Sequence, residues 1–329
     1  MNEVSKKLIV KLAIISLLMS GCAIPPSIKD ATEIAKNTKV VFGSVEVYRD
    51  GKQEKWGMKF TGYNYFYLTI LPPDTNEAIT YKLDKDGVFY WAIPPGEYTL
   101  LGYYWQDHDV KRTGHIDAKF IVPEIGGDVY LGSIEFHSNR GYLVPKFQDK
   151  YDEIAKLYDL KFPNRKGTAV KGLFEPPQPM GNFSSYRYVC NDDWKIECNN
   201  SKSGIITLSP AISQVGFPTV SSLKPEFRWK PSERQDISYD IIIYEAAAYA
   251  VSGAASSSYM RGRVVAYKEG LEESYWQPEN PLKPKTRYFW SVRLREGDTV
   301  SEWSTHGHFI FLVVAMSSGS GQWFQFRTP

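Results

Sequence analysis

Residues 87–100 read GVFYWAIPPGEYTL, and this stretch decides the fold of the amino-terminal half of the chain. Two short runs rich in aromatic and β-branched residues flank the pair Pro95 and Gly96. Such runs are typical of antiparallel strands joined by a tight turn, because Pro and Gly supply the backbone angles that a turn needs. We therefore predict two adjacent strands, with the Tyr98 ring entering the core where the second strand begins.

The same pattern continues on both sides of this stretch, between residues 40 and 137. Turn residues such as Asp50 and Gly51 recur about every 8–15 positions, and no helical periodicity interrupts the strands. The predicted strands cover residues 39–49, 63–71, 79–83, 88–93, 98–105, 116–122 and 128–136. Short strands at this spacing predict an antiparallel β-sandwich.

The motif within residues 87–100 resembles the G-x-F … L-P-P-G-x-Y-x-L signature of prealbumin-like, carboxypeptidase-regulatory-like bacterial domains. Residues 129–134 (VYLGSI) also look like the closing strand of such domains. The resemblance covers residues 40–137. It implies a domain without catalytic activity, since most members of this group are not enzymes.

A second β pattern begins near Thr207. Several of its motifs resemble those of a fibronectin type III domain. They are P-x-F-x-W at 225–229, Y-x-I-x-I at 239–243, L-x-P-x-T-x-Y-x-W-x-V-R at 282–293 and S-x-W-S at 301–304. The resemblance spans residues 210–329 and implies a second antiparallel β-sandwich.

This resemblance assigns roles to individual aromatic residues. It makes Trp229 the early core tryptophan and Tyr288 the corner tyrosine, whose hydroxyl bonds back to the backbone while its ring fills the core. Because side chains alternate along a strand, Tyr288, Trp290 and Val292 share one face.

Arg293 and Arg295 share the opposite face of the same strand, where we expect them to stack near Trp303 as a cation–π pair. Two stretches depart from the family pattern. Residues 246–263 form a longer insertion, expected as a mobile loop or a short helix. Residues 309–315 (FIFLVVA) are too short to span a membrane and are expected as a buried strand.

Between the two sandwiches we expect a connector over residues 138–180. Asp149 is placed to cap a short helix within it, and Pro163 would end that helix. The residues predicted to share one face of the helix are Tyr151, Ile154, Ala155 and Tyr158. The whole chain is therefore predicted to be all-β, with sandwich domains at 40–137 and 181–329.

Residues 1–21 have the layout of a secretory signal peptide, with three early lysines, an apolar run over 12–19 and small residues at 20 and 21. Residues 18–22 (LMSGC) resemble a bacterial lipobox. That resemblance implies cleavage before Cys22, a diacylglyceryl thioether on its sulfur and acylation of the new amino group. An ordinary signal peptide followed by a chance cysteine is the alternative.

Alanine at position 23, where inner-membrane lipoproteins commonly have Asp, implies the bacterial outer membrane by the same resemblance. Residues 22–39 would then form the lipid attachment and a short polar tether. Cleavage removes three lysines and one glutamate, which leaves 36 basic and 36 acidic side chains. This balance excludes a strongly basic membrane- or nucleic-acid-binding surface, so lipid must hold the protein at the membrane.

Cys190 and Cys198 enclose seven residues, among them Trp194. This spacing fits neither a redox C-x-x-C motif nor a zinc pair. Because an exported protein meets an oxidising compartment, we predict a disulfide between them. Two free, buried thiols are the alternative.

The sequence has no complete catalytic or metal-binding motif. The one stretch that mixes imidazole and carboxylate contains Asp107, His108, Asp109, His115 and Asp117. Lys111 and Arg112 lie within it, so we interpret it as a solvated loop rather than a metal site. We predict no catalytic, cofactor-binding or metal-ligating residue.

Two smaller groups receive the same interpretation. His306 and His308 alternate on one predicted strand, which indicates surface histidines. Asp84 and Asp86 precede a glycine but lack the bidentate glutamate of a calcium loop.

We expect a lipid-anchored envelope protein that binds or scaffolds other envelope proteins, within an outer-membrane assembly. A carbohydrate- or peptidoglycan-binding module is the alternative, and an envelope enzyme is a third, less favoured one. An exposed row of Tyr and Trp on one sheet would favour binding. A deep cleft around Asp107, His108 and His115 would favour an enzyme.

Overall fold

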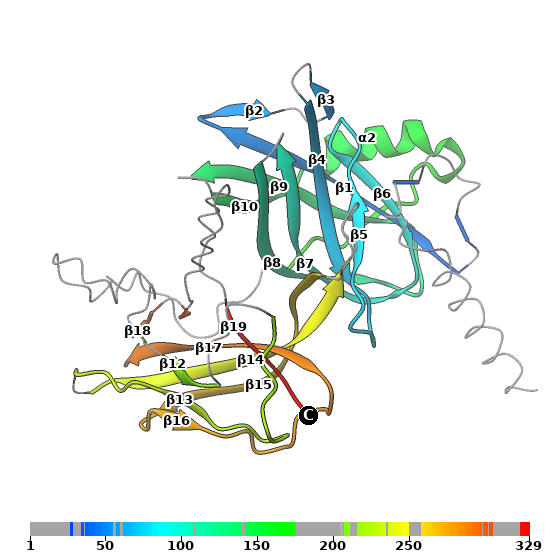
Figure 1. Cartoon of the computed structure of the whole chain (residues 1–329). Coiled ribbons are helices and arrows are strands. Elements are labelled where there is room, and N and C mark those ends of the chain that lie inside the picture. Colours follow the sequence, from blue (N-terminus) through cyan, green and yellow to red (C-terminus); the bar gives the residue numbers. More distant parts are fainter. Residues whose placement is uncertain are drawn as a thin grey trace, which may run out of the picture. The chain divides into compact units, whose positions relative to one another are not determined.

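The chain of the computed structural model divides into two units, one formed by Met1–Pro177 with Ala248–Met260 and the other by Gln178–Ala247 with Arg261–Pro329 (Figure 1). The structure describes residues 27–28, 34–35, 37–54, 57–59, 62–107, 110–139, 142–175, 205, 207–210, 216–234, 236–249, 258–297, 299–301, 303–304 and 323–329. We call 27–175 the first domain and the described residues from 205 to 329 the second domain, although the ends of two of its strands, at 248–249 and 258–260, group with the first unit. Both are built from β-sheets, which confirms the all-β prediction.

The first domain is a sandwich of two sheets around one apolar core, which contains Phe66, Trp91, Trp105 and Phe136. One sheet has the order β10 (Tyr142–Gln148), β9 (Val129–Asn139), β1 (Lys39–Arg49) and β2 (Lys52–Glu54), with β6 (Val88–Ile93) on β1 and β11 (Val170–Lys171) on β9. The other has the order β3 (Gly57–Lys59), β4 (Gly62–Leu71), β7 (Gly96–Asp107) and β8 (Val110–Val122), with β5 (Ile79–Lys82) on β4.

The two turns singled out in the sequence are present. Asp50 and Gly51 have φ of 51° and 74° and join β1 to β2, the left-handed pair that a two-residue hairpin needs. Gly96 has φ of 153°, and a Cβ there would lie 2.8 Å from Pro73 Cγ, so only glycine fits this turn. Tyr98 is buried as predicted, and its hydroxyl donates to the Pro94 carbonyl at 2.9 Å.

Two pairings in the first domain are parallel instead of antiparallel, β1 with β9 and β11 with β9. β9 lies beside β1 and runs parallel to it, from Val41 opposite Val129 to Tyr48 opposite His137. The chain passes through the other sheet before β9 begins, so the closing strand can enter beside β1 from the same end. Local sequence carries no signal for this choice of partner.

Helix α2 (Tyr151–Lys161) covers the outer face of the β1–β9 sheet and makes a second apolar core there (Figure 1). Asp149 accepts the Tyr151 N–H at 3.1 Å, and the helix ends two residues before Pro163, as predicted. The buried residues of this second core are Ile28, Val40, Phe42, Val88, Tyr90, Tyr130, Ile154, Tyr158 and Phe162.

The first domain therefore extends beyond the predicted boundary at residue 137, into the expected connector 138–180. Strand β10 continues the sheet after β9. A buried carboxylate holds the segment after α2, because Asp128 accepts hydrogen bonds from Arg165 and from the Tyr158 hydroxyl. The segment after β11 then reaches the other sheet, where Glu175 and Lys119 exchange backbone hydrogen bonds of 2.7 and 2.9 Å. This strap closes one edge of the sandwich.

The expected polar tether, residues 22–39, is also partly built into the first domain. Ser27 and Ile28 are buried, and the Ile28 N–H donates to the Tyr90 carbonyl at 2.9 Å. Ile34 packs against the same apolar core. Apolar side chains at 28 and 34 explain why the segment adheres to the domain instead of remaining a free tether.

The second domain is a sandwich of a small sheet and a larger one. The small sheet has the order β12 (Thr207–Ser209), β13 (Phe227–Trp229) and β16 (Tyr275–Trp276). The larger sheet has the order β15 (Ser258–Leu271), β14 (Ser238–Tyr249), β17 (Arg287–Glu296) and β18 (Thr299–Val300), with β19 (Phe324–Arg327) on β17. Their inner faces share one core that includes Trp229, Ile241, Tyr288 and Trp290.

The contacts predicted for Tyr288 are observed. The Tyr288 side chain is fully buried, its hydroxyl accepts the Lys283 N–H at 3.0 Å, and it donates to the Lys283 carbonyl at 3.4 Å. Trp229, Trp290 and Val292 are buried in the same core. Burial raises the pKa of Tyr288.

We expected the insertion 246–263 to be a mobile loop or a short helix. At both of its ends the structure instead has β-strand. β14 runs to Tyr249 and β15 starts at Ser258, so the two strands simply continue. Residues 250–257 and the predicted buried strand 309–315 lie outside the described part. Among the described residues, no helix combines the length and hydrophobicity needed to cross a bilayer.

Candidate functional site

The residues predicted to carry covalent chemistry lie outside the described part of the chain. They are Cys22, Cys190 and Cys198. The same holds for His108, Asp109, His306 and His308. Lipid attachment and the disulfide therefore remain predictions.

Within the Asp107–Asp117 stretch, the backbone separates Asp107 from His115. Asp107 pairs with Val110 at the β7–β8 end, whereas His115 lies five positions further along β8. Five strand residues span about 16 Å. His115 is exposed and Asp117 is half-buried. Within the described ranges, no group of three His, Cys, Asp or Glu side chains is placed to hold a metal.

Asp84 and Asp86 form a turn. Asp86 Oδ1 accepts the Val88 N–H at 3.1 Å, and the Asp84 carbonyl accepts the Gly87 N–H at 3.1 Å. The Asp86 carboxylate thus shapes the hairpin that leads into β6, which accounts for its position without a calcium ion.

The outer face of the larger sheet in the second domain carries the most distinctive arrangement of side chains. Arg293 lies under the Trp303 ring, with Cζ 4.5 Å from the centroid, which confirms the predicted stacking for Arg293. The Trp323 ring lies 5.8 Å from that of Trp303, and Arg261 Cζ lies 4.3 Å from the Trp323 centroid. Tyr244 completes the row at 5.4 Å from Trp323. We call these five residues the arginine–tryptophan face.

Two serines hold Trp303 in place. Ser301 Oγ accepts the Leu294 N–H at 2.9 Å, and Ser304 Oγ accepts the Val292 N–H at 3.2 Å. The backbone N–H groups of both serines donate to carbonyls of the same strand at 2.9 Å. The S-x-W-S motif therefore lays its tryptophan across β17, directly over Arg293.

A buried carboxylate organises the arginines beneath this face. Asp240 accepts from Arg293 Nε at 2.8 Å and from Arg295 at 2.7 and 2.9 Å. Arg295 also pairs with Glu269 at 2.9 Å. The Asp240 hydrogen bond raises the pKa of Arg295 above its usual value. Fixed cations stacked on flat rings suit binding, whereas proton transfer needs groups that titrate near neutral pH.

In the first domain, the side chains of one charged cluster pair with one another. Lys150 Nζ lies 2.8 Å from Glu46 Oε1 and 3.0 Å from Glu135 Oε1. His137 Nε2 lies 3.3 Å from the other Glu135 oxygen, and the Tyr48 hydroxyl donates to Glu46. Burial raises the pKa of Glu135, but Lys150 and His137 outweigh it and hold that pKa below its usual value. The ion pairs tie the start of α2 to the sheet.

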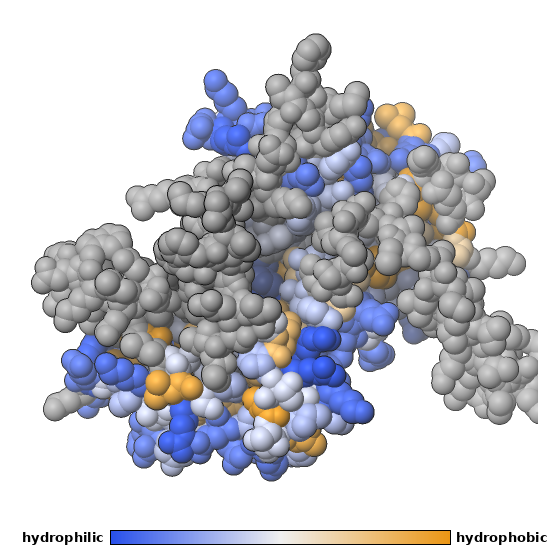
Figure 2. All heavy atoms as spheres, in the orientation of Figure 1, coloured by the Kyte–Doolittle hydropathy of each residue, from blue (hydrophilic) through white to orange (hydrophobic). Residues whose placement is uncertain are grey.

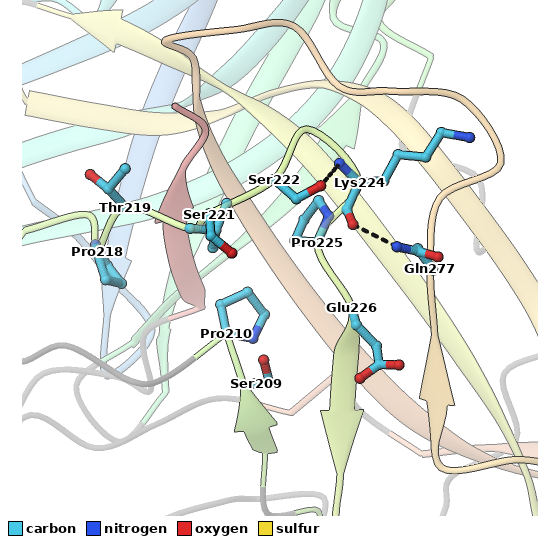
Figure 3. Close-up of a pocket in the computed structure, with 11 residues that line it drawn as sticks. Ser209, Pro210, Pro218, Thr219, Ser221, Ser222, Lys224, Pro225, Glu226 and Gln277 are labelled. Atoms are coloured by element: carbon cyan, nitrogen blue, oxygen red, sulfur yellow. Dashed lines mark hydrogen bonds between the residues drawn. The ribbon is translucent and has the colours of Figure 1, made fainter.

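A polar depression of about 510 Å³ lies beside the small sheet of the second domain (Figure 3). Hydroxyl groups of Ser209, Thr219, Ser221 and Ser222 line it together with three prolines. The Gln277 amide donates to the Lys224 carbonyl at 2.7 Å, and the Lys224 N–H donates to Ser222 Oγ at 3.0 Å. Lys224 and Glu226 also line it, and its other polar side chains are neutral hydroxyl and amide groups.

Sequence reasoning found Arg293 and Trp303 but missed Asp240, Arg261 and Trp323. The outward direction of Asp240 could have been predicted from the sequence, because Asp240 alternates with the core-facing apolar residues of β14. Arg261 and Trp323 come from strands whose pairing depends on long insertions, so their convergence has no local signal.

Comparison with known proteins assigns this chain to no family. No family model matches the chain. No curated protein matches either.

Solved structures match only distantly. A leucine-rich repeat protein from Bacteroides thetaiotaomicron is 12% identical over 83% of this chain, with a TM-score of 0.24. This chain spans only 24% of that protein. A DUF3823 family protein from Parabacteroides merdae is 9% identical, with 90% of this chain and 100% of that chain covered and a TM-score of 0.18. The FN1–FN3 domains of chicken CNTN1 are 9% identical, with 81% and 66% covered and a TM-score of 0.17. None is close enough to transfer a function.

Proposed function

We propose that this chain is a lipid-anchored protein of the bacterial outer membrane that acts as a non-catalytic binding or scaffolding component. Lipid on Cys22 would anchor it, and other envelope proteins would be its partners. The arginine–tryptophan face is the observation that carries the binding role. Arg293 is buried beneath it, so its contact area comes from the half-buried Tyr244, Arg261, Trp303 and Trp323, residue types that dominate protein interfaces.

The family relations belong to the same proposal. The first domain is prealbumin-like and the second is fibronectin type III-like. Support comes from the three- and four-stranded paths of the second domain, β12-β13-β16 and β15-β14-β17-β18, and from the Tyr288 contact.

Anchoring is tested by replacing the lipid-bearing residue. Cys22→Ser should abolish incorporation of labelled palmitate and leave the protein unprocessed or soluble, because no thioether can form. Fractionation of envelopes and palmitate labelling measure both effects. A Cys22→Ser protein that still carries label and partitions into detergent contradicts lipid attachment at this residue.

Binding is tested by cross-linking the lipidated protein in intact envelopes and identifying the captured molecules. Trp323→Ala should remove at least about 1.4 kcal/mol of binding, a tenfold loss, if the face is an energetic centre. Tyr275→Ala on the small sheet is the matched control, because it also removes an exposed aromatic ring. Equal capture by wild type and both variants contradicts the assignment of this face.

A glycan-binding role is the second candidate, and the depression in Figure 3 is the observation that favours it. Neutral hydroxyl and amide groups match the hydroxyl groups of sugars. Gln277→Ala should then weaken sedimentation with peptidoglycan sacculi several-fold, while Trp323→Ala leaves it unchanged. No sedimentation of the wild-type protein rules out peptidoglycan as the ligand.

A further inference from the structure

The attachment point of the amino-terminal segment on the first domain is well defined. Ile28 is buried and hydrogen-bonded to the Tyr90 carbonyl, and Ser27 Oγ lies 3.4 Å from the Tyr90 nitrogen. The Tyr90 ring lies 5.5 Å from that of Phe162, and Lys161 Nζ lies 4.6 Å from the Tyr90 centroid. The segment therefore docks beside the carboxyl end of α2.

The chain length then limits how far this end can be from the proposed lipid. Six residue steps separate Cys22 from Ile28. Fully extended, they reach about 20 Å. A diacylglyceryl group on Cys22 consequently holds Ile28 within about 20 Å of the bilayer interface, and the carboxyl end of α2 lies close to Ile28.

The same end of the domain exposes large apolar side chains. Leu157 is 41% exposed and Leu160 is 79% exposed, and their i,i+3 spacing places them side by side on α2. Ile125, which is 90% exposed, lies in the turn before Asp128, and Asp128 bonds Tyr158 of α2. In Figure 2 hydrophobic atoms reach the surface over α2, at the upper right.

Basic groups accompany these apolar ones. Lys156 is exposed and Lys161 lies in the last turn of α2, whereas the acidic residues Asp152 and Glu153 lie in its first turn. The carboxyl half also contains Asp159, whose carboxylate accepts the Gly167 N–H at 3.3 Å. It is thus apolar, with two lysines against one aspartate. That combination suits the headgroup region of a phospholipid bilayer, where apolar side chains enter the acyl boundary and ammonium groups meet phosphates.

We propose that Leu157, Leu160 and Ile125 form a membrane-contact surface that rests on the bilayer to which the lipid on Cys22 is anchored. The inference rests on the proposed lipid anchoring. The membrane-contact surface also defines how the anchored protein is oriented, because one face of the first domain then lies flat on the membrane.

The test uses full-length lipidated protein in vesicles of phosphatidylethanolamine and phosphatidylglycerol. An environment-sensitive fluorescent amino acid replaces Leu160 in one sample and Leu208, a 58% exposed residue of the second domain, in the control. Spin-labelled lipids should quench the reporter at 160 at least about threefold more than the reporter at 208. Equal quenching at the two positions overturns the membrane-contact surface.

A second measurement asks whether the leucines themselves hold the contact. A reporter at 125 should lose most of its quenching in a Leu157→Ser, Leu160→Ser variant and keep it in a Val264→Ser control. Flotation of the vesicles reports anchoring separately. Protein that floats without quenching at 160 keeps the lipid anchor and overturns the contact. Protein that carries no lipid and does not float overturns both.

Discussion

The two domains differ in what covers the outer face of one core sheet. In the first domain, α2 covers the β1–β9 sheet and turns its outer face into a second apolar core, with Phe42 and Tyr158 stacked at 4.4 Å. In the second domain, the outer face of the larger sheet carries charged and aromatic side chains, with Trp303 and Trp323 half-buried over it. A helix therefore covers the outer face in the first domain, whereas half-buried aromatic rings cover it in the second domain. We propose that the second kind of face binds a partner.

Each outer face also contains one buried aspartate with arginine partners. Asp128 pairs with Arg165 and with the Tyr158 hydroxyl, and burial together with that hydrogen bond raises the pKa of Tyr158 to about 12. Asp240 pairs with Arg293 and Arg295. A fully buried pair is expensive to break, because the remaining charge has no solvent.

The largest expected effect is at Asp240. Asp240→Ala should destabilise the second domain by about 3–5 kcal/mol, since it leaves the fully buried Arg293 without its carboxylate. Hydrogen exchange of the full chain, read peptide by peptide, measures each domain separately. Glu269→Ala removes an exposed partner of Arg295 and should cost at most about 1 kcal/mol. Similar losses for the two variants would show that burial does not set the cost.

An effect of similar or slightly smaller size is expected at the two buried tyrosines. Tyr158→Ala in the first domain and Tyr288→Ala in the second should each cost about 3–5 kcal/mol through the cavity left by the ring. Tyr288→Phe, which removes only the hydroxyl, should cost about 1–3 kcal/mol. The same exchange measurement applies. A Tyr288→Ala protein as stable as Tyr275→Ala, which removes an exposed ring, would contradict the corner role.

A ring that only covers the second domain should matter less for stability. Trp303→Ala loses one cation–π contact and a half-buried ring, so we expect about 1–2 kcal/mol. Urea unfolding followed by exchange in β17 measures this. A loss of stability as large as that of Tyr158→Ala would mean that the outer face of the second domain is as tightly packed as that of the first.

The smallest effect concerns pH and the first domain. The pKa of Glu135 is below its usual value in the folded protein, so its pairing stabilises the fold above about pH 4.3. That stability disappears as the pH falls through the folded pKa. Between pH 6 and pH 3 wild type should lose up to about 1 kcal/mol more than Glu135→Gln. If the free energy of unfolding falls equally in both proteins between pH 6 and pH 3, Glu135 does not contribute to the acid sensitivity of the first domain.

Local periodicity explains which parts of the fold were predictable. Alternation along residues 288–295 places Tyr288 in the core and Arg293 outside, and the Asp50–Gly51 pair fixes a hairpin, because both depend on neighbours in sequence. The strand limits depend on neighbouring residues in the same way.

The remainder depends on contacts between distant residues. Nothing local indicates that β9 pairs with β1, that residues 142–175 complete the first domain, or that Ile28 docks on Tyr90. The candidate site shows the same division, since Trp303 is evident from its motif and Arg261 is not. These features depend on the free energy gained when segments distant in sequence bury apolar surface against each other. The local pattern of a single sequence does not show which segments do so.

The comparison of the two outer faces is tested most directly by hydroxyl-radical footprinting of the full chain, which reads side-chain exposure residue by residue. We predict that Trp303 and Trp323 are oxidised several-fold faster than the fully buried Trp290. Tyr158 of α2 and Phe162 at its carboxyl end, which both face the core between the helix and the sheet, should stay protected. Protection of Trp303 and Trp323 equal to that of Trp290 would contradict an open arginine–tryptophan face in the second domain.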